Sequence, residues 1–63
     1  MFVVQNRETK HYLGHCSTVG DVIWLDNINN HMVDKYDTIQ SLKGDLNWVP
    51  WYWWWMRYKI IKI

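Results

Sequence analysis

Three histidines and one cysteine are the residues of this 63-residue chain whose types could support metal binding or nucleophilic catalysis. They are His11, His15, Cys16 and His31. A zinc site needs four ligands with at least one close pair held by local geometry, but the adjacent His15 and Cys16 would point to opposite sides of a strand. Catalysis by Cys16 with a histidine and Asp21 or Asp26 would require a pocket for the substrate. Because so short a chain rarely encloses one, the sequence predicts no catalytic residue, no metal ligand and no cofactor.

The single cysteine also bears on the compartment, because it excludes a disulfide within the chain and fits a reducing environment. The opening apolar run from Met1 to Val4 is too short for a signal peptide, and charged residues follow it at once. The aromatic run near the C-terminus is shorter than the roughly 20 apolar residues that a membrane-spanning helix needs. We therefore expect a cytoplasmic protein that does not enter a membrane.

Length and charge indicate one domain over residues 1–63 with a small core, since a chain of this size buries only about 60% of its unfolded surface. Seven Lys and Arg against six Asp and Glu leave the total charge near neutral, which disfavours a nucleic-acid-binding protein. The distribution is uneven. After Asp45 the chain holds Arg57, Lys59 and Lys62 and no acidic residue.

The stretch W-V-P-W-Y-W-W-W-M, from Trp48 to Met56, contains five of the six tryptophans. In one interpretation all of these rings belong to an aromatic core that compensates for small size. In the other, at least two or three rings are exposed as a contact patch. Rings at positions 51, 53, 54 and 55 of a strand cannot all face one side, so we favour the second interpretation.

Hydrophobic patterning predicts strands over residues 2–6, 11–14 and 22–25, with a polar turn between the first two and a loop over residues 15–21. A helix is predicted over residues 34–42, with Asp34 or Asp37 as its N-cap and Gly44 after its end. Its apolar positions recur at helical spacing and are Tyr36, Ile39 and Leu42, with Leu46 beyond. The elements indicate an α+β domain: an antiparallel sheet of three to four strands with one helix on one face.

The segment from Trp51 to Ile63 is predicted to form one long closing strand, begun by Pro50. Alternation separates two faces. The even positions should lie in the core, namely Tyr52, Trp54, Met56, Tyr58 and Ile60. The odd positions should face outward, although a bulge near Arg57 would exchange the two faces. The partner-binding residues predicted from this division are Trp48, Trp51, Trp53, Trp55, Arg57 and Lys59.

Several occupants suit such a patch, because Trp, Tyr and Arg dominate the energetics of protein interfaces. A partner protein is the first. A second copy of the chain is another, since a symmetric dimer would cover the patch. Single-stranded nucleic acid is the alternative function, with bases stacking on tryptophan and the basic strand following the phosphates. A membrane surface is a weaker fit for a chain with a single short helix.

The order of elements also carries a resemblance. It consists of the hairpin F-V-V-Q-N-R-E-T-K-H-Y-L, the lone tryptophan in V-I-W-L-D-N-I-N-N, the helix D-K-Y-D-T-I-Q-S-L and the closing strand Y-K-I-I-K-I. This order resembles the small ββ(β)αβ accessory proteins of bacteriophages, from which the W-V-P-W-Y-W-W-W stretch departs. The resemblance implies that the closing strand pairs with the first strand. It further implies a non-enzymatic inhibitor that binds a bacterial host protein in the host cytoplasm.

Overall fold

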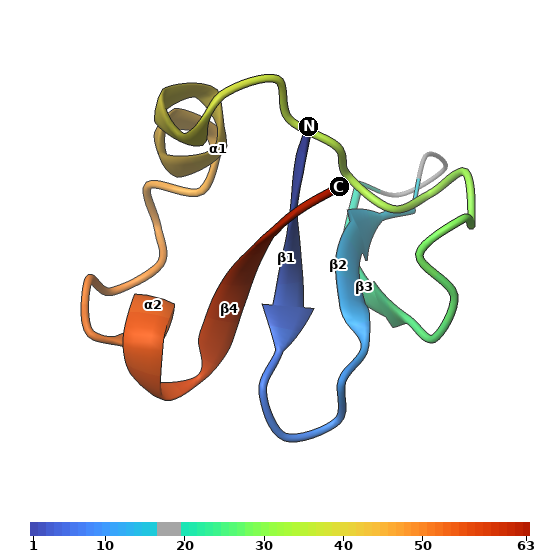
Figure 1. Cartoon of the computed structure of the whole chain (residues 1–63), viewed down its shortest axis with the longest axis horizontal. Coiled ribbons are helices and arrows are strands. Elements are labelled where there is room, and N and C mark those ends of the chain that lie inside the picture. The colour runs from blue at the N-terminus through green and yellow to red at the C-terminus, as the bar shows by residue number, and fades with distance from the viewer. Residues whose placement is uncertain (17–19) are drawn as a thin grey trace.

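The computed structural model describes residues 1–16 and 20–63, in which a curved antiparallel sheet lies beside two short helices (Figure 1). The strands are β1 (Phe2–Asn6), β2 (Tyr12–His15), β3 (Val22–Leu25) and β4 (Tyr58–Lys62), in the spatial order β3-β2-β1-β4. The helices are α1 (Ile39–Asp45) and α2 (Trp53–Met56). The predicted fold class is confirmed, as is the pairing of the C-terminal strand with the N-terminal one. Part of the predicted loop, residues 17–19, lies outside the described residues.

The turn between β1 and β2 is organised by the side chain of Asn6. Its Oδ1 accepts hydrogen bonds from the backbone N–H groups of Glu8 and Thr9, at 2.9 and 3.1 Å. The turn closes with Lys10 in the left-handed region, at a φ of 65°. Asparagine stabilises such a turn because its short side chain reaches the backbone two and three residues on. The positive φ of Lys10, by contrast, is sterically unfavourable for a residue with a Cβ atom.

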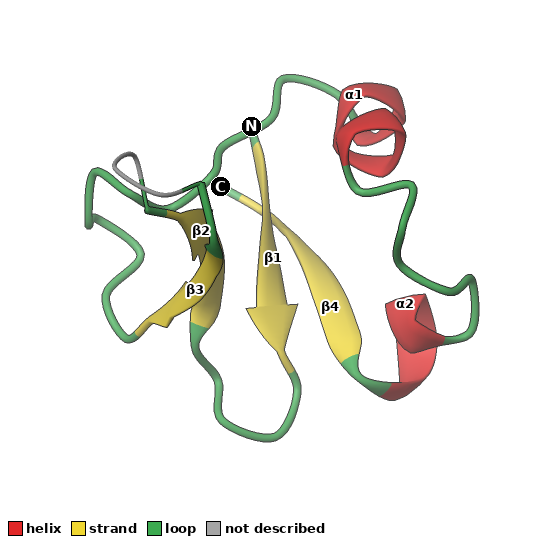
Figure 2. Ribbon diagram, turned by 180° about the vertical axis from the view of Figure 1, so that it is seen from behind, coloured by secondary structure: helices red, strands yellow, loops and turns green. Residues whose placement is uncertain are grey.

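A segment formed by residues 32–36 passes between β1 and β2 and is called the bridging segment below. Tyr36 exchanges both backbone hydrogen bonds with Phe2 of β1, at 2.7 and 2.9 Å. On the other side Val33 forms a bridge with Gly14 of β2, and the N–H of Asp34 donates to the carbonyl of Leu13. Figure 2 shows β1 and β2 as neighbours joined by a turn at one end, and the residues paired between these strands are Gln5 and Tyr12, next to that turn. The bridging segment therefore joins strands that pair directly only near their turn.

Gly14 permits this close approach of the bridging segment. A Cβ atom at position 14 would lie 2.2 Å from the carbonyl oxygen of Met32 and 2.8 Å from Cδ1 of Leu25. The first contact is with backbone, which cannot rotate away as a side chain can. Only glycine fits at this position without displacing the segment.

The core lies on the face of the sheet that carries Val4, Leu13 and Tyr58. Leu42 and Leu46 of the α1 region cover these residues, together with Val49. Burying such apolar side chains contributes about 1.5 to 3 kcal/mol each. The helix is therefore attached to the sheet by the two leucines that the sequence pattern placed on one face.

Helix α1 begins later than predicted, and neither Asp34 nor Asp37 caps it. The N-cap is Thr38, whose hydroxyl accepts a 3.0 Å hydrogen bond from the N–H of Ser41. Asp34 is unavailable to the helix because the bridging segment holds it in extended pairing with β2. Gly44 lies inside the last turn rather than after the helix. The predicted apolar face is correct for Leu42 and Leu46, whereas Ile39 is exposed.

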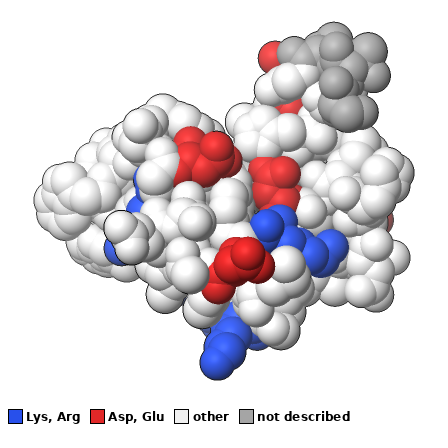
Figure 3. Space-filling view, turned by 90° about the horizontal axis from the view of Figure 1, so that it is seen from above, with Lys and Arg blue, Asp and Glu red and all other residues white. Residues whose placement is uncertain are grey.

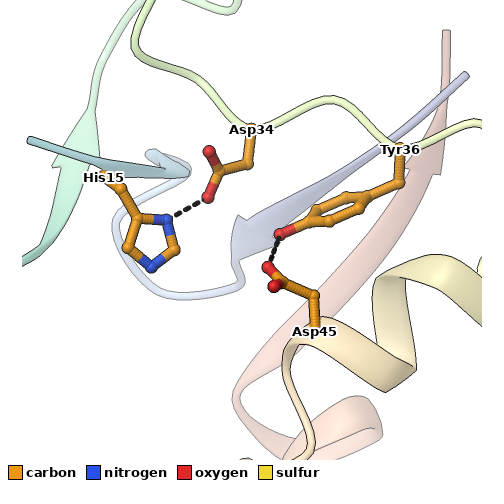
Figure 4. Close-up of polar contacts among 4 residues, drawn as sticks. All are labelled: His15, Asp34, Tyr36 and Asp45. Carbon is orange, nitrogen blue, oxygen red and sulfur yellow. Dashed lines mark hydrogen bonds and ion pairs between the residues drawn. The ribbon is translucent and has the colours of Figure 1, made fainter. Parts of the chain in front are cut away.

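Two side-chain contacts fasten the bridging segment on either side (Figure 4). Nδ1 of His15 bonds Oδ2 of Asp34, and both side chains are partly buried. The hydroxyl of Tyr36 donates to Asp45, the last residue of α1, at 2.6 Å. Burial raises the pKa of Tyr36 well above its usual range, with further contributions from the hydrogen bond to Asp45 and the charge of Asp34. The segment thus connects β2 to the end of α1.

The long closing strand predicted from Trp51 to Ile63 is wrong in its first half. Only Tyr58–Lys62 form β4, and their register with β1 is continuous from Phe2 opposite Lys62 to Asn6 opposite Tyr58, with no bulge. The physical reason is the length of β1. Continuing the same register would carry residues 51–56 past the turn after Asn6, where β1 has ended and no strand can pair with them. Their backbone groups are satisfied locally instead, by turns and by helix α2.

Candidate functional site: an exposed aromatic surface

Helix α2 is a single turn that folds the tryptophan run back on itself. The carbonyl of Pro50 accepts from the N–H of Trp53 at 3.0 Å, and the carbonyl of Tyr52 accepts from Met56 at 3.1 Å. The carbonyl of Trp53 then accepts from Arg57 at the start of β4. Helical geometry spreads successive side chains around an axis instead of onto two faces. The residues of α2 therefore do not alternate between two strand faces as predicted. They are divided instead between a side of the helix that faces the core and a side that faces solvent.

Five large apolar side chains point to solvent in this region and are called the aromatic surface below: Trp48, Trp51, Tyr52, Trp55 and Met56. Trp51 is 75% exposed and Trp55 is 61% exposed. Tyr52 and Met56 were predicted to lie in the core, and both predictions are wrong because their positions belong to the turn and to α2. The five side chains lie within one short segment, residues 48–56, and a large exposed apolar patch marks an interaction site more often than isolated exposed residues do.

The other side of α2 is anchored in the core by Trp53 and Trp54. Their rings meet the ring of Tyr58 edge-on, with centres 5.8 and 6.2 Å apart. Trp24 of β3, at the opposite edge of the sheet, approaches the same tyrosine over the core face, at 5.3 Å. Edge-to-face aromatic pairs contribute about 0.5 to 1.5 kcal/mol each beyond the area they bury. Tyr58 is therefore the centre of an aromatic cluster that supports the aromatic surface from below.

Of the predicted site residues, Trp48, Trp51 and Trp55 lie on the aromatic surface, whereas Trp53 is half-buried. The outward position predicted for Trp53 is thus wrong: its ring packs on Tyr58 and is covered by the guanidinium of Arg57, 4.7 Å from the ring centre. Burial also raises the pKa of Tyr58, and the positive charge of Arg57 opposes this effect. Arg57 and Lys59 are both exposed.

Basic side chains gather beside the aromatic surface along β4. Arg7 donates from Nε to the carbonyl oxygen of Tyr58 at 2.8 Å and from its backbone N–H to the carbonyl of Arg57 at 2.9 Å. Arg57, Lys59 and Lys62 follow one another along the strand. In Figure 3 the side of the molecule that carries α1 and α2 in Figure 1 is mostly uncharged. The sequence offered no signal for the role of Arg7, because its partners are distant along the chain.

An open hollow of about 500 Å³ lies where the β1–β2 turn meets the start of β4. It is lined by Asn6, Glu8, Trp24, Met56, Arg57 and Tyr58. Neither Cys16 nor any histidine lines it. The hollow thus adjoins the aromatic surface through Met56 and the aromatic cluster through Tyr58, and it does not assemble the thiol and imidazole chemistry that the residue types suggested.

The described residues that could bind a metal or act in catalysis are not gathered at one site. His15 is engaged by Asp34, and His31 is exposed on the turn that precedes the bridging segment. Within residues 1–16 and 20–63, no group of three or more His, Cys, Asp or Glu side chains is arranged to hold a metal ion. Among the same residues, no helix has the length and apolar character to cross a membrane. The aromatic surface is therefore the strongest candidate site in the described part of the chain.

Comparisons with models of protein families, with curated proteins and with solved structures each gave no match to this chain.

Proposed function

We propose that this protein is a non-enzymatic protein-binding module that contacts its partner through the aromatic surface. The observation that carries the proposal is the exposure of Trp51 and Trp55 on a turn whose neighbouring tryptophans are fixed in the core. Exposing this much aromatic area to water costs free energy, and an interface recovers it. A functional role accounts for the exposure of both rings better than folding does.

The support beneath the surface favours binding by a preformed site. Trp53 and Trp54 hold α2 against Tyr58, so the exposed rings extend from a turn that is already ordered. A site ordered before binding loses less conformational entropy when the partner arrives. Tryptophan adds large area with few rotatable bonds, which is why it is common among interface hot spots.

The finer proposal concerns the partner. The element order resembles that of small bacteriophage accessory proteins, and it supports a host bacterial protein as the partner and inhibition as the consequence of binding. An inhibitor of this kind needs no catalytic residue, only a surface that covers a functional region of its target. Such a protein would act in the cytoplasm of the host.

Two other occupants compete for the aromatic surface. A second copy of the chain would bury the same rings across a symmetric interface. Single-stranded nucleic acid would stack on Trp51 and Trp55, with Arg57 and Lys59 near the phosphates. The formal net charge of +1 supplies little long-range attraction for nucleic acid, so the protein partner is the better-supported proposal.

The test compares three immobilised proteins in bacterial lysate: wild type, Trp51→Ala/Trp55→Ala, and the control Val22→Ala/Ile39→Ala. The control removes apolar side chains that are also exposed but lie on β3 and α1. A protein captured by the wild type and the control, and lost with the tryptophan variant, is then purified and its activity is measured with and without the module. Binding without inhibition would reject the inhibitor role, and equal capture by all three proteins would reject the aromatic surface as the site.

Salt dependence separates the nucleic-acid alternative from the protein partner. If the protein binds single strands, an oligothymidylate of about 20 nucleotides should quench its tryptophan fluorescence at low salt. This quenching should weaken steeply as the salt concentration rises. We expect no such quenching. Saturable quenching that is lost in Trp51→Ala/Trp55→Ala would replace the proposed function with nucleic-acid binding.

A further inference from the structure

The hydrogen-bond register of β1 and β4 determines which backbone groups of β4 face outward. Ile63 exchanges hydrogen bonds with Met1, and the N–H of Arg7 donates to the carbonyl of Arg57. In an antiparallel pair such bonded positions occur at every second residue. Lys59 and Ile61 are therefore the residues of β4 that bond to β1.

The intervening residues of β4 direct their N–H and C=O groups away from β1. They are Tyr58, Ile60 and Lys62. The carbonyl of Tyr58 accepts from Nε of Arg7. Within the described residues, no backbone group donates to or accepts from the outward groups of Ile60 and Lys62. β4 is an edge strand, and such an edge is a template for another strand.

The positive charge along this edge indicates which kind of strand could pair with β4. Arg57 and Lys59 lie along one face of this edge and Lys62 on the other, because side chains alternate along a strand, and Arg7 is bonded to the edge at Tyr58. A second β4 from another copy would bring two such basic edges together, which opposes pairing. An acidic segment would be attracted by the same charges and would place its side chains opposite them.

We propose that the outer edge of β4 binds an extended, acidic segment of the partner protein, which adds to the sheet as a fifth strand beside the aromatic surface. The inference rests on the proposed function, because it specifies the form and charge of the partner segment. Main-chain hydrogen bonds to Ile60 and Lys62 supply the pairing, and the basic side chains select acidic sequences. Because α2 directly precedes β4, a partner segment bound along the edge of β4 lies close to the exposed tryptophans.

Amide hydrogen exchange tests the edge in the free protein and then with a probe peptide. We expect the amides of Lys59, Ile61 and Ile63 to be protected while those of Ile60 and Lys62 exchange rapidly. A capped peptide of four Glu-Val repeats should slow exchange at Ile60 and Lys62, and a capped Lys-Val peptide should bind at least ten-fold more weakly. Protection of both amides in the free protein, or equal binding of the two peptides, would overturn the proposal. Protection that grows with protein concentration would assign the edge to a second copy and would also overturn it.

Substitution at Lys62 provides the second test. Lys62→Pro removes an outward N–H that takes no part in pairing with β1, whereas Lys62→Gln removes the charge and keeps the N–H. We expect the proline variant to lose binding of the Glu-Val peptide by at least ten-fold relative to the glutamine variant. Equal binding by the two variants would contradict strand addition. Should the proline variant unfold, the exchange pattern and the peptide comparison in wild type still decide the proposal.

The two proposals fail independently. Trp51→Ala/Trp55→Ala tests the aromatic surface, whereas Lys62→Pro tests the sheet edge, because Lys62 is at the end of β4 away from α2. Loss of the captured partner in the tryptophan variant but not in Lys62→Pro would retain the proposed function and reject strand addition. If the peptide binds at the edge while capture is unaffected by the tryptophan substitutions, strand addition is retained and the aromatic surface is rejected as the binding site.

Discussion

Trp24 and Tyr58 lie with their ring centres 5.3 Å apart, although β2 and β1 separate the strands that carry them. The sheet must therefore curve toward the core face so that its two edge strands approach each other over that face. Trp53 and Trp54 meet the same tyrosine ring from α2. One cluster thus sets the curvature of the sheet and the position of the helix that presents the aromatic surface.

Removing a ring of this cluster should cost far more stability than removing an exposed one. We expect Trp24→Ala to lower the free energy of unfolding by about 2 kcal/mol, because a large, partly buried ring that packs against Tyr58 and the core is lost. Trp51→Ala, the same substitution at a side chain that is 75% exposed, should cost less than about 0.5 kcal/mol. Urea unfolding followed by circular dichroism measures both. Equal costs would contradict the separation of core rings from surface rings.

The two glycines at positions 14 and 44 should respond in opposite directions to alanine. Gly14→Ala should destabilise the protein by about 2 kcal/mol or more, because the new Cβ collides with the carbonyl of Met32. Gly44→Ala should stabilise it by about 1 kcal/mol, since Gly44 lies in α1 with nothing within 4 Å of the new atom. Thermal unfolding of both variants provides the measurement. A neutral Gly14→Ala would mean that the bridging segment does not approach β2 so closely.

The turn between β1 and β2 contains an avoidable cost at Lys10. Its φ of 65° places a side chain in the left-handed region, which disfavours residues other than glycine by about 1 to 2 kcal/mol. Lys10→Gly should raise the free energy of unfolding by about 0.5 to 1 kcal/mol, because the added freedom of the unfolded chain offsets part of the gain. Lys10→Ala is the matched control and should show no such increase. A less stable glycine variant would contradict the turn geometry.

The hydrogen bond from Tyr36 to Asp45 should make stability fall at alkaline pH. The pKa of Tyr36 is raised in the folded state, so its contribution is fully present below the pKa of the unfolded chain, about 10, and is lost as pH rises above that value. Tyr36→Phe should cost about 1 kcal/mol at pH 8 and should show a shallower decline from pH 9.5 to 11.5. Urea unfolding across this range tests the sign. A parallel decline in both proteins would show that Tyr36 is not its source.

The sheet could be predicted from the sequence because each strand has a local signal. β-branched and aromatic runs mark β1 and β3, and the spacing of Leu42 and Leu46 identifies the face of α1 that contacts them. The cap at Thr38 was missed because Asp34 and Asp37 are equally good capping residues by type. Only the long-range pairing of the bridging segment removes Asp34 from that role.

The error in the tryptophan run has a different cause. Trp and Tyr favour strands, but residues 51–56 have no strand in the described chain with which to pair. The turn at Asn6 limits β1, and pairing between the two ends of the chain then limits β4 to a similar length. Both features were predicted, so a shorter closing strand follows from them. The burial of Trp53 beneath Arg57 could not be foreseen, because it depends on the helical turn.

The most direct test of the aromatic surface is the dissociation constant of the purified captured partner, measured by isothermal titration calorimetry. Each of Trp51 and Trp55 should contribute about 2 kcal/mol as a hot spot, so Trp51→Ala/Trp55→Ala should weaken binding by roughly several hundred-fold. Val22→Ala/Ile39→Ala should bind like the wild type. An unchanged dissociation constant in a folded tryptophan variant would contradict the account.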